Sequence, residues 1–501
     1  MQQPVHLGPK PLTREDVHAV ARGDAPVALT DAAREAVTTA RAHIERLATA
    51  EKPTYGVSTG FGALAVRHIP PDRRAALQQS LVRSHAAGAG PEVEREVVRA
   101  LVLLRLKTLA SGHTGVRLET AEAMAAMLNA GITPVVHEFG SLGCSGDLAP
   151  LSAAALALTG EGHVRDASGE LVTAADALKQ AGITPVKLAE KEGLALINGT
   201  DGMLGMLVLA IKDLHHLLDV ADLTAAMSVE ALLGTDRVFA ADLHALRPHP
   251  GQGRSARRMA ELLAGSEIME SHRGPDCTRV QDAYSLRCSP QVHGAARDTV
   301  AYAETVADRE LASSVDNPVV LPDGRVESNG NFHGAPVAYV LDFLAIPVAD
   351  VASIAERRTD RMLDVNRSHG LPPFLADDPG VDSGHMIAQY TQAAIVSELK
   401  RLAVPASVDS IPSSAMQEDH VSMGWSAARK LRKAVDGLRT VLAVELLTAA
   451  RALDLRAPLK PAPATAAAVA KLRELVPGPG PDRHLAPEIA AAEDLIRSGA
   501  L

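Results

Sequence analysis

The segment GSLGCSGDLAPLS, residues 140–152, places a Cys-Ser-Gly triplet inside a glycine-rich stretch of a chain that is otherwise rich in Ala and Leu. A phosphate-binding loop would continue into Gly-Lys-Ser or Gly-Lys-Thr, and this segment does not. A hydrolase nucleophile would occupy a Gly-x-Ser-x-Gly elbow, whereas Ser145 directly follows Cys144. Neither nucleotide binding nor serine hydrolysis therefore accounts for the triplet.

An X-Ser-Gly triplet can react with itself when its loop is held bent. The amide nitrogen of Gly146 attacks the carbonyl carbon of Cys144, loss of water closes a five-membered ring, and loss of the Ser145 hydroxyl leaves an exocyclic methylene. Glycine suits the third position because its nitrogen is unhindered and its backbone tolerates strained torsions. The Cys144 side chain stays outside the conjugated ring, so the reaction permits other residues there. The triplet can thus make an electrophile from the backbone.

Composition restricts the partners of such a site. The 501 residues include 47% hydrophobic and 22% charged side chains, which is typical of a globular protein with a sizeable core. The formal net charge of -10 argues against nucleic acid and anionic membrane surfaces, so a small molecule is the expected partner. The longest apolar stretch, residues 203–223, is interrupted by charged residues, and we expect no membrane span.

The cysteines indicate the cellular setting. Cys144, Cys277 and Cys288 show no CxxC or Cys/His ligand spacing, so we expect neither a disulfide framework nor a metal site. The N-terminal residues lack the basic and apolar segments of a secretion signal. A reducing, cytoplasmic setting is the expectation.

The elements that must position the triplet are helices. Thr13, followed three residues later by Asp16, is typical of a helix-capping box. Long helices are predicted from apolar periodicity over residues 92–110, 117–130, 202–234, 291–314, 334–358, 384–403 and 419–454. One short hairpin is expected within residues 162–174. These lengths indicate an all-α, elongated bundle of long helices.

The irregular segments between these helices are where chemistry is expected, because loops on a rigid scaffold carry most functional residues. They comprise residues 53–62, 136–152, 196–202, 266–290, 321–333 and 405–420. We expect two domains: a smaller loop-rich N-terminal domain at residues 1–203 that carries the triplet, and a long-helix bundle with a C-terminal helical part at residues 204–501.

The triplet segment resembles the loop of the histidine and phenylalanine ammonia-lyase family that forms a methylidene-imidazolone (MIO) from Ala-Ser-Gly or Cys-Ser-Gly. Seven further blocks resemble family blocks in the family's order, and together they span nearly the whole chain. They are YGVSTGFGALA (55–65), RSHAAG (83–88), ALINGTDGM (195–203), QDAYSLRC (281–288), SSVDNPVV (313–320), NGNFHG (329–334) and MQEDHVSMG (416–424).

The resemblance implies roles in the loss of ammonia from an α-amino acid. Tyr55 matches the catalytic tyrosine that removes the β-proton; a phenol is a poor base at neutral pH, so a nearby cation or donor must lower its pKa. Arg287 resembles the clamp for the substrate carboxylate. Gln281 and Tyr284 resemble residues that line and polarise the site, and Asn198 resembles the amide that bonds the carbonyl of the prosthetic ring.

Each of these residues also has a structural interpretation. Tyr55 can be a half-buried turn residue, Arg287 one half of a surface ion pair, and Asn198 part of an Asn-Gly turn.

Substrate choice depends on groups that face the side chain of the amino acid. His85 occupies the family's selectivity position, and Glu418 resembles the carboxylate that holds an imidazole N–H in histidine lyases and that can also accept the β-proton indirectly. Phe332 is expected to pack on the ligand ring, and Met386 to contact the ligand. The structural alternatives are a packed core histidine for His85 and a helix N-terminal acid for Glu418.

Two positions depart from the family pattern. Ala153 stands where histidine lyases usually place His, and His385 stands before Met386, where an apolar residue is usual. Either change can retune the pocket.

The resemblance implies an all-α member of the ammonia-lyase/fumarase-like superfamily that deaminates L-histidine to trans-urocanate and ammonia. It implies no external cofactor and no metal, a cytoplasmic enzyme, and a homotetramer whose subunits share active sites. One alternative is an aminomutase that returns the ammonia to the β-carbon. Another is a helical scaffold or binding protein that has lost the chemistry.

Overall fold

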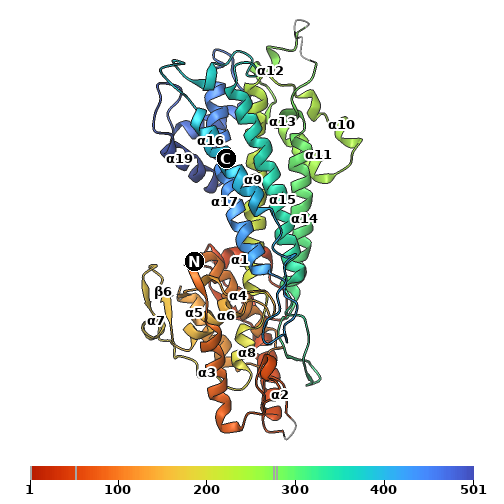
Figure 1. The fold of residues 1–501 in the computed structure, drawn as a ribbon, viewed down its shortest axis with the longest axis vertical. Coiled ribbons are helices and arrows are strands. Elements are labelled where there is room, and N and C mark those ends of the chain that lie inside the picture. Colours follow the sequence, from red (N-terminus) through yellow and green to blue (C-terminus); the bar gives the residue numbers. More distant parts are fainter. Residues whose placement is uncertain (1–2, 51–52, 275–276, 278–279) are drawn as a thin grey trace. The chain divides into compact units, whose positions relative to one another are not determined.

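The computed structural model describes residues 3–50, 53–274, 277 and 280–501, and its regular structure is mostly helical (Figure 1). The chain divides into two compact units. Unit 1 comprises Met1–Leu209, Glu304–Asp342 and Pro405–Arg429, and unit 2 comprises Ala210–Ala303, Phe343–Val404 and Lys430–Leu501. The expected all-α class is confirmed, while the division after residue 203 stays a prediction.

Unit 1 holds the helices α1 (Arg14–Ala21), α2 (Asp31–Ala48), α3 (Arg74–His85), α4 (Arg95–Ala110), α5 (Leu118–Asn129), α6 (Leu148–Leu158), α7 (Ala174–Gln180) and α8 (Glu192–Ile197). Unit 2 holds α10 (Ala241–Ala245), α11 (Pro250–Leu262), α12 (Glu267–Glu270), α13 (Tyr284–Arg287), α16 (Met386–Leu402), α18 (Pro463–Arg473) and α19 (Leu485–Arg497). Four longer helices contribute residues to both units: α9 (Asp201–Ala231), α14 (Ser289–Ala312), α15 (Ala335–Leu363) and α17 (Gly424–Asp454).

The described strands are short. β1 (Val5–Leu7) pairs in parallel with β2 (Val27–Leu29). Antiparallel pairs join β3 (Ala89–Glu92) to β5 (His137–Phe139), β4 (Thr133–Pro134) to β6 (His163–Arg165), β6 to β7 (Leu171–Thr173), and β8 (Val319–Val320) to β9 (Val326–Glu327). The β6–β7 pair confirms the hairpin expected from the sequence.

Local sequence signals explain several helix boundaries. Thr13 accepts a hydrogen bond from the Asp16 backbone and Asp16 reaches back to the Thr13 backbone, so the predicted capping box is confirmed. The helix predicted over residues 419–454 instead begins at Gly424. Residues 419–423 are not helical, and Met423, directly before Gly424, has a φ of +53°, which an α-helix does not accommodate.

Within unit 1, α4 is buried on all sides from Val97 to Ala110, as a core helix must be. Helices α3, α6 and α8 pack on one another. Within unit 2, residues of α9, α14, α15 and α17 line one small apolar cavity, which shows that these parts of the four helices pack together. Each unit therefore has its own core of packed helices.

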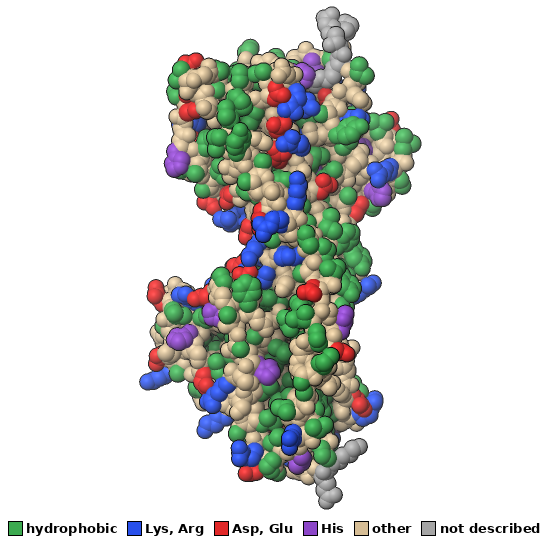
Figure 2. Space-filling view, in the orientation of Figure 1, with side chains coloured by type: hydrophobic (Ala, Val, Ile, Leu, Met, Phe, Trp, Pro, Cys, Tyr) green, Lys and Arg blue, Asp and Glu red, His purple; other side chains and the backbone are tan. Residues whose placement is uncertain are grey.

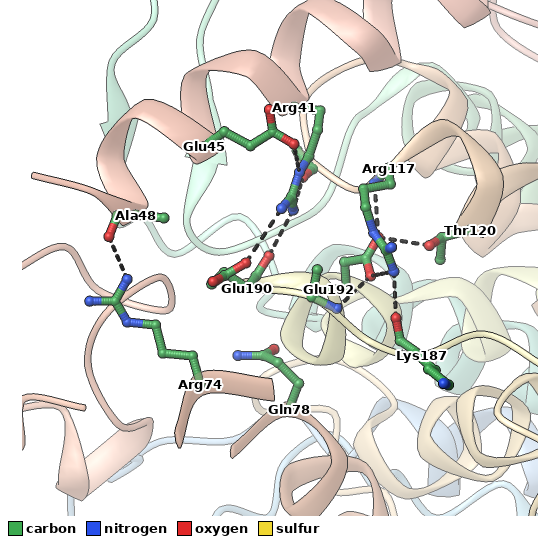
Figure 3. A network of polar contacts seen from close by, with 12 residues as sticks. Arg41, Glu45, Ala48, Arg74, Gln78, Arg117, Thr120, Lys187, Glu190 and Glu192 are labelled. Atoms are coloured by element: carbon green, nitrogen blue, oxygen red, sulfur yellow. Dashed lines mark hydrogen bonds and ion pairs between the residues drawn. The ribbon is translucent and has the colours of Figure 1, made fainter. Parts of the chain in front are cut away.

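A buried polar network fixes α8 in unit 1 (Figure 3). The carboxylate of Glu192 accepts hydrogen bonds from Arg117 Nη2 at 2.7 Å and from Thr120 Oγ1 at 2.7 Å. Gln78 on α3 accepts a hydrogen bond from the Gly193 backbone at 2.9 Å. Since these contacts hold α8 from two sides, they also fix Asn198, the residue that ends this helix.

The surface shows no preference for one sign of charge on the visible face, where acidic and basic side chains are interspersed (Figure 2). Helix α15 is long and apolar enough to cross a membrane by length and composition, but 61% of its apolar window is buried inside the structure. Such burial is typical of a core helix.

Candidate active site

Five of the residues singled out in the sequence line one cavity in unit 1. The cavity has a volume of about 560 Å³, and its lining includes Tyr55, His85, Ser145, Asn198 and Glu418. They come from five separate segments: the loop before residue 62, the end of α3, the Cys-Ser-Gly loop, the end of α8 and the loop before α17. The fold therefore brings together residues that are up to 363 positions apart in the sequence.

The third residue of the triplet leaves no room for a side chain. Gly146 has a φ of +80°, and a Cβ built on it would lie 2.0 Å from the carbonyl oxygen of Gly199. The following amide, Asp147 N–H, donates to the same oxygen at 2.7 Å. Glycine is required here for both its torsion and its size, which is the backbone condition that cyclisation of the triplet needs.

Asp147 ties the loop to the start of α9. Its Oδ2 accepts from the backbone N–H groups of Gly202 and Met203, both at 2.9 Å, and its Oδ1 accepts from Ser141 Oγ at 2.9 Å. Burial raises the pKa of Asp147 to about 7, although these hydrogen bonds oppose the rise. The carboxyl group thus caps a helix terminus and holds the loop at once.

The other end of the loop is held by the segment before α17. Ser422 Oγ donates to the Gly143 carbonyl at 2.8 Å, and the Met423 N–H donates to the Leu142 carbonyl at 2.9 Å. The triplet is therefore fixed on both sides by segments that lie far away in the sequence. These contacts hold the loop on both sides of the triplet, as cyclisation of a bent Cys-Ser-Gly segment requires.

Asn198 provides a polar group beside Ser145. Its backbone carbonyl accepts from Arg105 Nη1 at 2.5 Å, and its Nδ2 donates to the Asn317 carbonyl at 3.3 Å. Its Oδ1 is buried and has no hydrogen-bond partner among the described residues. Because an amide oxygen accepts hydrogen bonds, it can take one from an N–H or O–H group of a ligand, while the Nδ2 group is the part of Asn198 that can donate to a carbonyl.

Tyr55 lies in the cavity with its hydroxyl oxygen 3.4 Å from the Gly62 N–H, which donates to it. Burial raises the pKa of Tyr55, the Gly62 hydrogen bond opposes this, and the negative charge of Glu418 adds to the rise. The expected donor, the Gly62 N–H, is present, but within one chain burial raises the pKa of the phenol more than this hydrogen bond lowers it. The phenol of the chain by itself is therefore protonated at neutral pH.

His85 ends α3 and lines the same cavity. Burial lowers its pKa, although a backbone hydrogen bond and Glu418 oppose the shift, so the ring is neutral at neutral pH. One ring nitrogen, Nδ1, lies 3.1 Å from Ser84 Oγ. A neutral imidazole can donate or accept a hydrogen bond and suits a polar ligand.

Glu418 faces the triplet directly. Its Oε2 accepts from Cys144 Sγ at 3.1 Å and from Ser413 Oγ at 3.1 Å, and its Oε1 accepts from Ser145 Oγ at 3.5 Å. The alternative interpretation of Glu418 as a helix N-terminal acid is wrong, because α17 begins only at Gly424. Its carboxylate instead contacts the triplet.

The other candidate residues lie elsewhere in the chain. Gln281, Tyr284 and Arg287 belong to unit 2, where Gln281 and Arg287 line a cavity of about 570 Å³. Arg287 stacks over the Tyr284 ring at 4.6 Å and donates from Nε to the Asp282 carbonyl at 2.9 Å. Tyr284 is 70% exposed, and neither it nor Arg287 lines the first cavity.

Met386 and Phe332 also lie outside the lining of the first cavity. Met386 begins α16 in unit 2 and lines a separate cavity of about 330 Å³. Phe332 is half-buried in the turn before α15. Their proposed contacts with a ligand stay predictions.

The two departures from the family pattern do not line the first cavity either. Ala153 lines a small cavity together with His137 and His163. His385 is buried in unit 2 beside Thr448 Oγ1, 3.1 Å from its Nδ1. Burial, reinforced by neighbouring arginines, lowers the pKa of His385 to about 3. The ring is therefore neutral at physiological pH.

Sequence reasoning missed several contributors to the cavity. Phe61 lines the cavity. Aromatic residues are rare in this chain, so the position of Phe61 within a glycine-rich segment could have identified it as a candidate. Ser413 and Arg105 do not line the cavity themselves but hold two residues that do, Glu418 and Asn198. Neither residue belongs to a pattern in the sequence that predicts such a contact. Among the described residues, no group of three or more His, Cys, Asp or Glu side chains could hold a metal ion.

Comparisons with known proteins identify relatives of the whole chain. A family model described as aromatic amino acid lyase matches residues 12–474. The chain is 67% identical to a histidine ammonia-lyase of Streptomyces avermitilis over 99% of this chain and 97% of that protein. Its fold is similar to a tyrosine aminomutase of Streptomyces globisporus, with a TM-score of 0.93, 38% identity, and coverage of 99% and 97%. It is also similar to a histidine ammonia-lyase of Trypanosoma cruzi, with a TM-score of 0.91, 38% identity, and coverage of 99% and 94%.

Proposed function

Because this chain belongs to the aromatic amino acid lyase family, we propose that it is a histidine ammonia-lyase, which converts L-histidine to trans-urocanate and ammonia. The observation that carries the proposal is the placement of Glu418 and His85, two groups suited to an imidazole, in one cavity with Tyr55 and Ser145. The high identity to a histidine ammonia-lyase over nearly the whole chain supports the same substrate.

Cys144, Ser145 and Gly146 form the prosthetic group under this proposal. The Gly146 nitrogen bonds to the Cys144 carbonyl carbon, and two water molecules leave, one from that carbonyl and one from the Ser145 side chain. The fit rests on the side-chain-free contact of Gly146 with Gly199 and on the hydrogen bonds that hold the loop on both sides, at Gly143 and at Asp147. The methylidene-imidazolone supplies an electrophile for the amino group of the substrate.

The remaining residues bind the substrate and move its proton. Glu418 accepts an imidazole N–H of the substrate, and the neutral His85 presents a second polar group to the same ring. Tyr55 Oη takes the β-proton. Since the Tyr55 phenol is protonated within one chain, completion of the site must bring a positive charge near it.

Arg287 of a second subunit is the group we assign to that task. It holds the substrate carboxylate through its planar guanidinium, and Gln281 and Tyr284 of the same segment line the completed site. The assignment requires at least two subunits in each site, and we propose a homotetramer with shared active sites that acts on free L-histidine in the cytoplasm. The isolated subunit is then inactive.

An aminomutase that converts L-histidine to β-histidine is the second candidate, because the similar folds include a tyrosine aminomutase. Incubation of the purified enzyme with L-histidine and identification of the product separates the two. Urocanate supports the lyase, β-histidine contradicts the lyase in favour of the aminomutase, and the absence of both products contradicts both candidates.

A further inference from the structure

The two oxygens of the Glu418 carboxylate face different surroundings. Oε2 is held by Cys144 Sγ and Ser413 Oγ, each at 3.1 Å. Oε1 has Ser145 Oγ at the longer distance of 3.5 Å, and Ser145 lines the cavity with Glu418. One oxygen is thus anchored by two donors, while the other is directed at the reacting residue.

The Cys144 thiol is suited to donating a hydrogen bond. Its side chain is buried in an apolar cluster with Val421 and Met423. Burial, with a further contribution from Glu418, raises the pKa of Cys144 to about 12, so the sulfur keeps its proton at neutral pH. An S–H group is a weak donor to neutral acceptors, but an ionised carboxylate strengthens the bond.

The proposed cyclisation changes the two oxygens unequally. It removes the hydroxyl of Ser145, the donor to Oε1, but leaves the Cys144 side chain intact, because only the backbone carbonyl of Cys144 enters the ring. Oε2 therefore keeps its two donors while Oε1 loses its own. A carboxylate with one anchored and one open oxygen is prepared to accept an N–H group from a ligand in the cavity.

We propose that Cys144 is a positioning residue: its S–H group, together with Ser413 Oγ, anchors Glu418 Oε2 and so turns Oε1 toward the imidazole of the substrate. This inference rests on the proposed function, and it gives the first residue of the triplet a task besides ring formation. The side chain at that position is then not interchangeable, although the cyclisation chemistry tolerates other residues.

Infrared spectroscopy tests the contact without any turnover. The difference between the spectra of the wild type and Cys144→Ala isolates the S–H stretching band of Cys144. In Glu418→Gln the carboxylate becomes a weaker, neutral acceptor, so that band moves to higher frequency. An unchanged band in Glu418→Gln would show that the thiol does not donate to Glu418 and would overturn the inference.

Steady-state kinetics with L-histidine test the consequence. Cys144→Ala is expected to raise KM about three- to tenfold with a change in kcat below about twofold, because Glu418 binds the ring equally in the ground state and the transition state. Cys144→Ser restores a donor and returns KM to within about twofold of the wild type. If the Ala and Ser variants behave alike, the side chain does not position Glu418.

A matched control removes a donor to another buried carboxylate. Thr465 Oγ1 donates to Glu230 Oε2 at 2.6 Å in unit 2. Thr465→Val lowers the melting temperature but leaves KM and the Cys144 infrared band unchanged.

The outcomes of these experiments separate the inference from the function on which it rests. If the wild type forms no urocanate, the proposed function fails, whatever the infrared result. If the wild type forms urocanate and Cys144→Ala has the wild-type KM, the function stands and the inference fails.

Discussion

Gly146 lies directly against Gly199, so closely that a single added methyl group on Gly146 would overlap the Gly199 carbonyl oxygen. Gly146→Ala therefore cannot keep the loop in place. We expect the variant to show the unmodified sequence mass and to lose urocanate formation, because the Gly146 nitrogen no longer reaches the Cys144 carbonyl. Mass spectrometry of the soluble protein and an absorbance assay for urocanate measure both.

Gly169→Ala is the control for this substitution. Gly169 also has a positive φ, of +88°, but a Cβ there meets no atom within 4 Å. This variant is strained by roughly 1–2 kcal/mol through its backbone torsion alone, and it should keep both the modified mass and the activity. Loss of the modification in Gly169→Ala would show that the assay reports general instability instead of the local contact.

The role of Glu418 predicts a large effect of removing its charge. Glu418→Gln keeps the shape of the side chain but weakens the acceptor for an imidazole N–H, so kcat/KM for L-histidine should fall at least about tenfold. Glu161→Gln is the matched control, because Glu161 pairs with the exposed Arg83 on the surface, where ion pairs contribute little. Equal kinetics for the two variants would remove Glu418 from the substrate site.

Shared sites predict a specific pattern of complementation. Ser145 and Arg287 belong to different units of the chain, and we assign them to different subunits of one site. Co-expression of Ser145→Ala with Arg287→Ala should then restore part of the activity that each variant lacks alone. Tyr55 and Ser145 line the same cavity of one chain, so Tyr55→Phe with Ser145→Ala should remain inactive. Activity in the second pair of variants, or no activity in either pair, contradicts the assignment of these residues to different subunits.

His385 predicts a pH dependence of stability. Its pKa in the folded chain is lowered to about 3 by burial and neighbouring arginines. Between its ordinary value, about 6.5, and about 3, the unfolded chain binds one more proton at this site than the folded chain does. Stability is therefore lost as the pH falls through this range, by at most about 1.4 kcal/mol per pH unit.

The measurement for His385 is the melting temperature between pH 7 and pH 4. The wild type should lose melting temperature more steeply on acidification than His385→Gln, which cannot gain that proton. His163→Gln, at an exposed position, should follow the wild type. Parallel curves for the wild type and His385→Gln would show that His385 is not buried in its neutral form.

The sequence determines much of this fold through local signals. The capping box at Thr13 and the apolar composition of α4 and α9 are local properties, so their helices follow from the chain itself. The start of α17 does not. The left-handed torsions at Ser414, Ala415 and Met416, and at Met423 directly before the helix, fall on residues other than glycine, so no local signal marks them.

The candidate site likewise has parts that the sequence predicts and parts that it does not. Motif order identified Tyr55, Ser145 and Glu418, and the fold places all three around one cavity. It did not identify the contact of Cys144 with Glu418, which joins residues 274 positions apart. Contacts over such separations depend on how helices pack, and no local pattern encodes them.

The proposed function requires that Cys144, Ser145 and Gly146 condense into a methylidene-imidazolone. Intact mass spectrometry of the active, purified enzyme detects this condensation without any assumption about the substrate, with Ser145→Ala as the reference. The wild type is expected to be lighter than its sequence mass by two water molecules, and Ser145→Ala is expected to lack the methylidene and to form no urocanate. A wild type that forms urocanate at its full sequence mass would contradict this requirement.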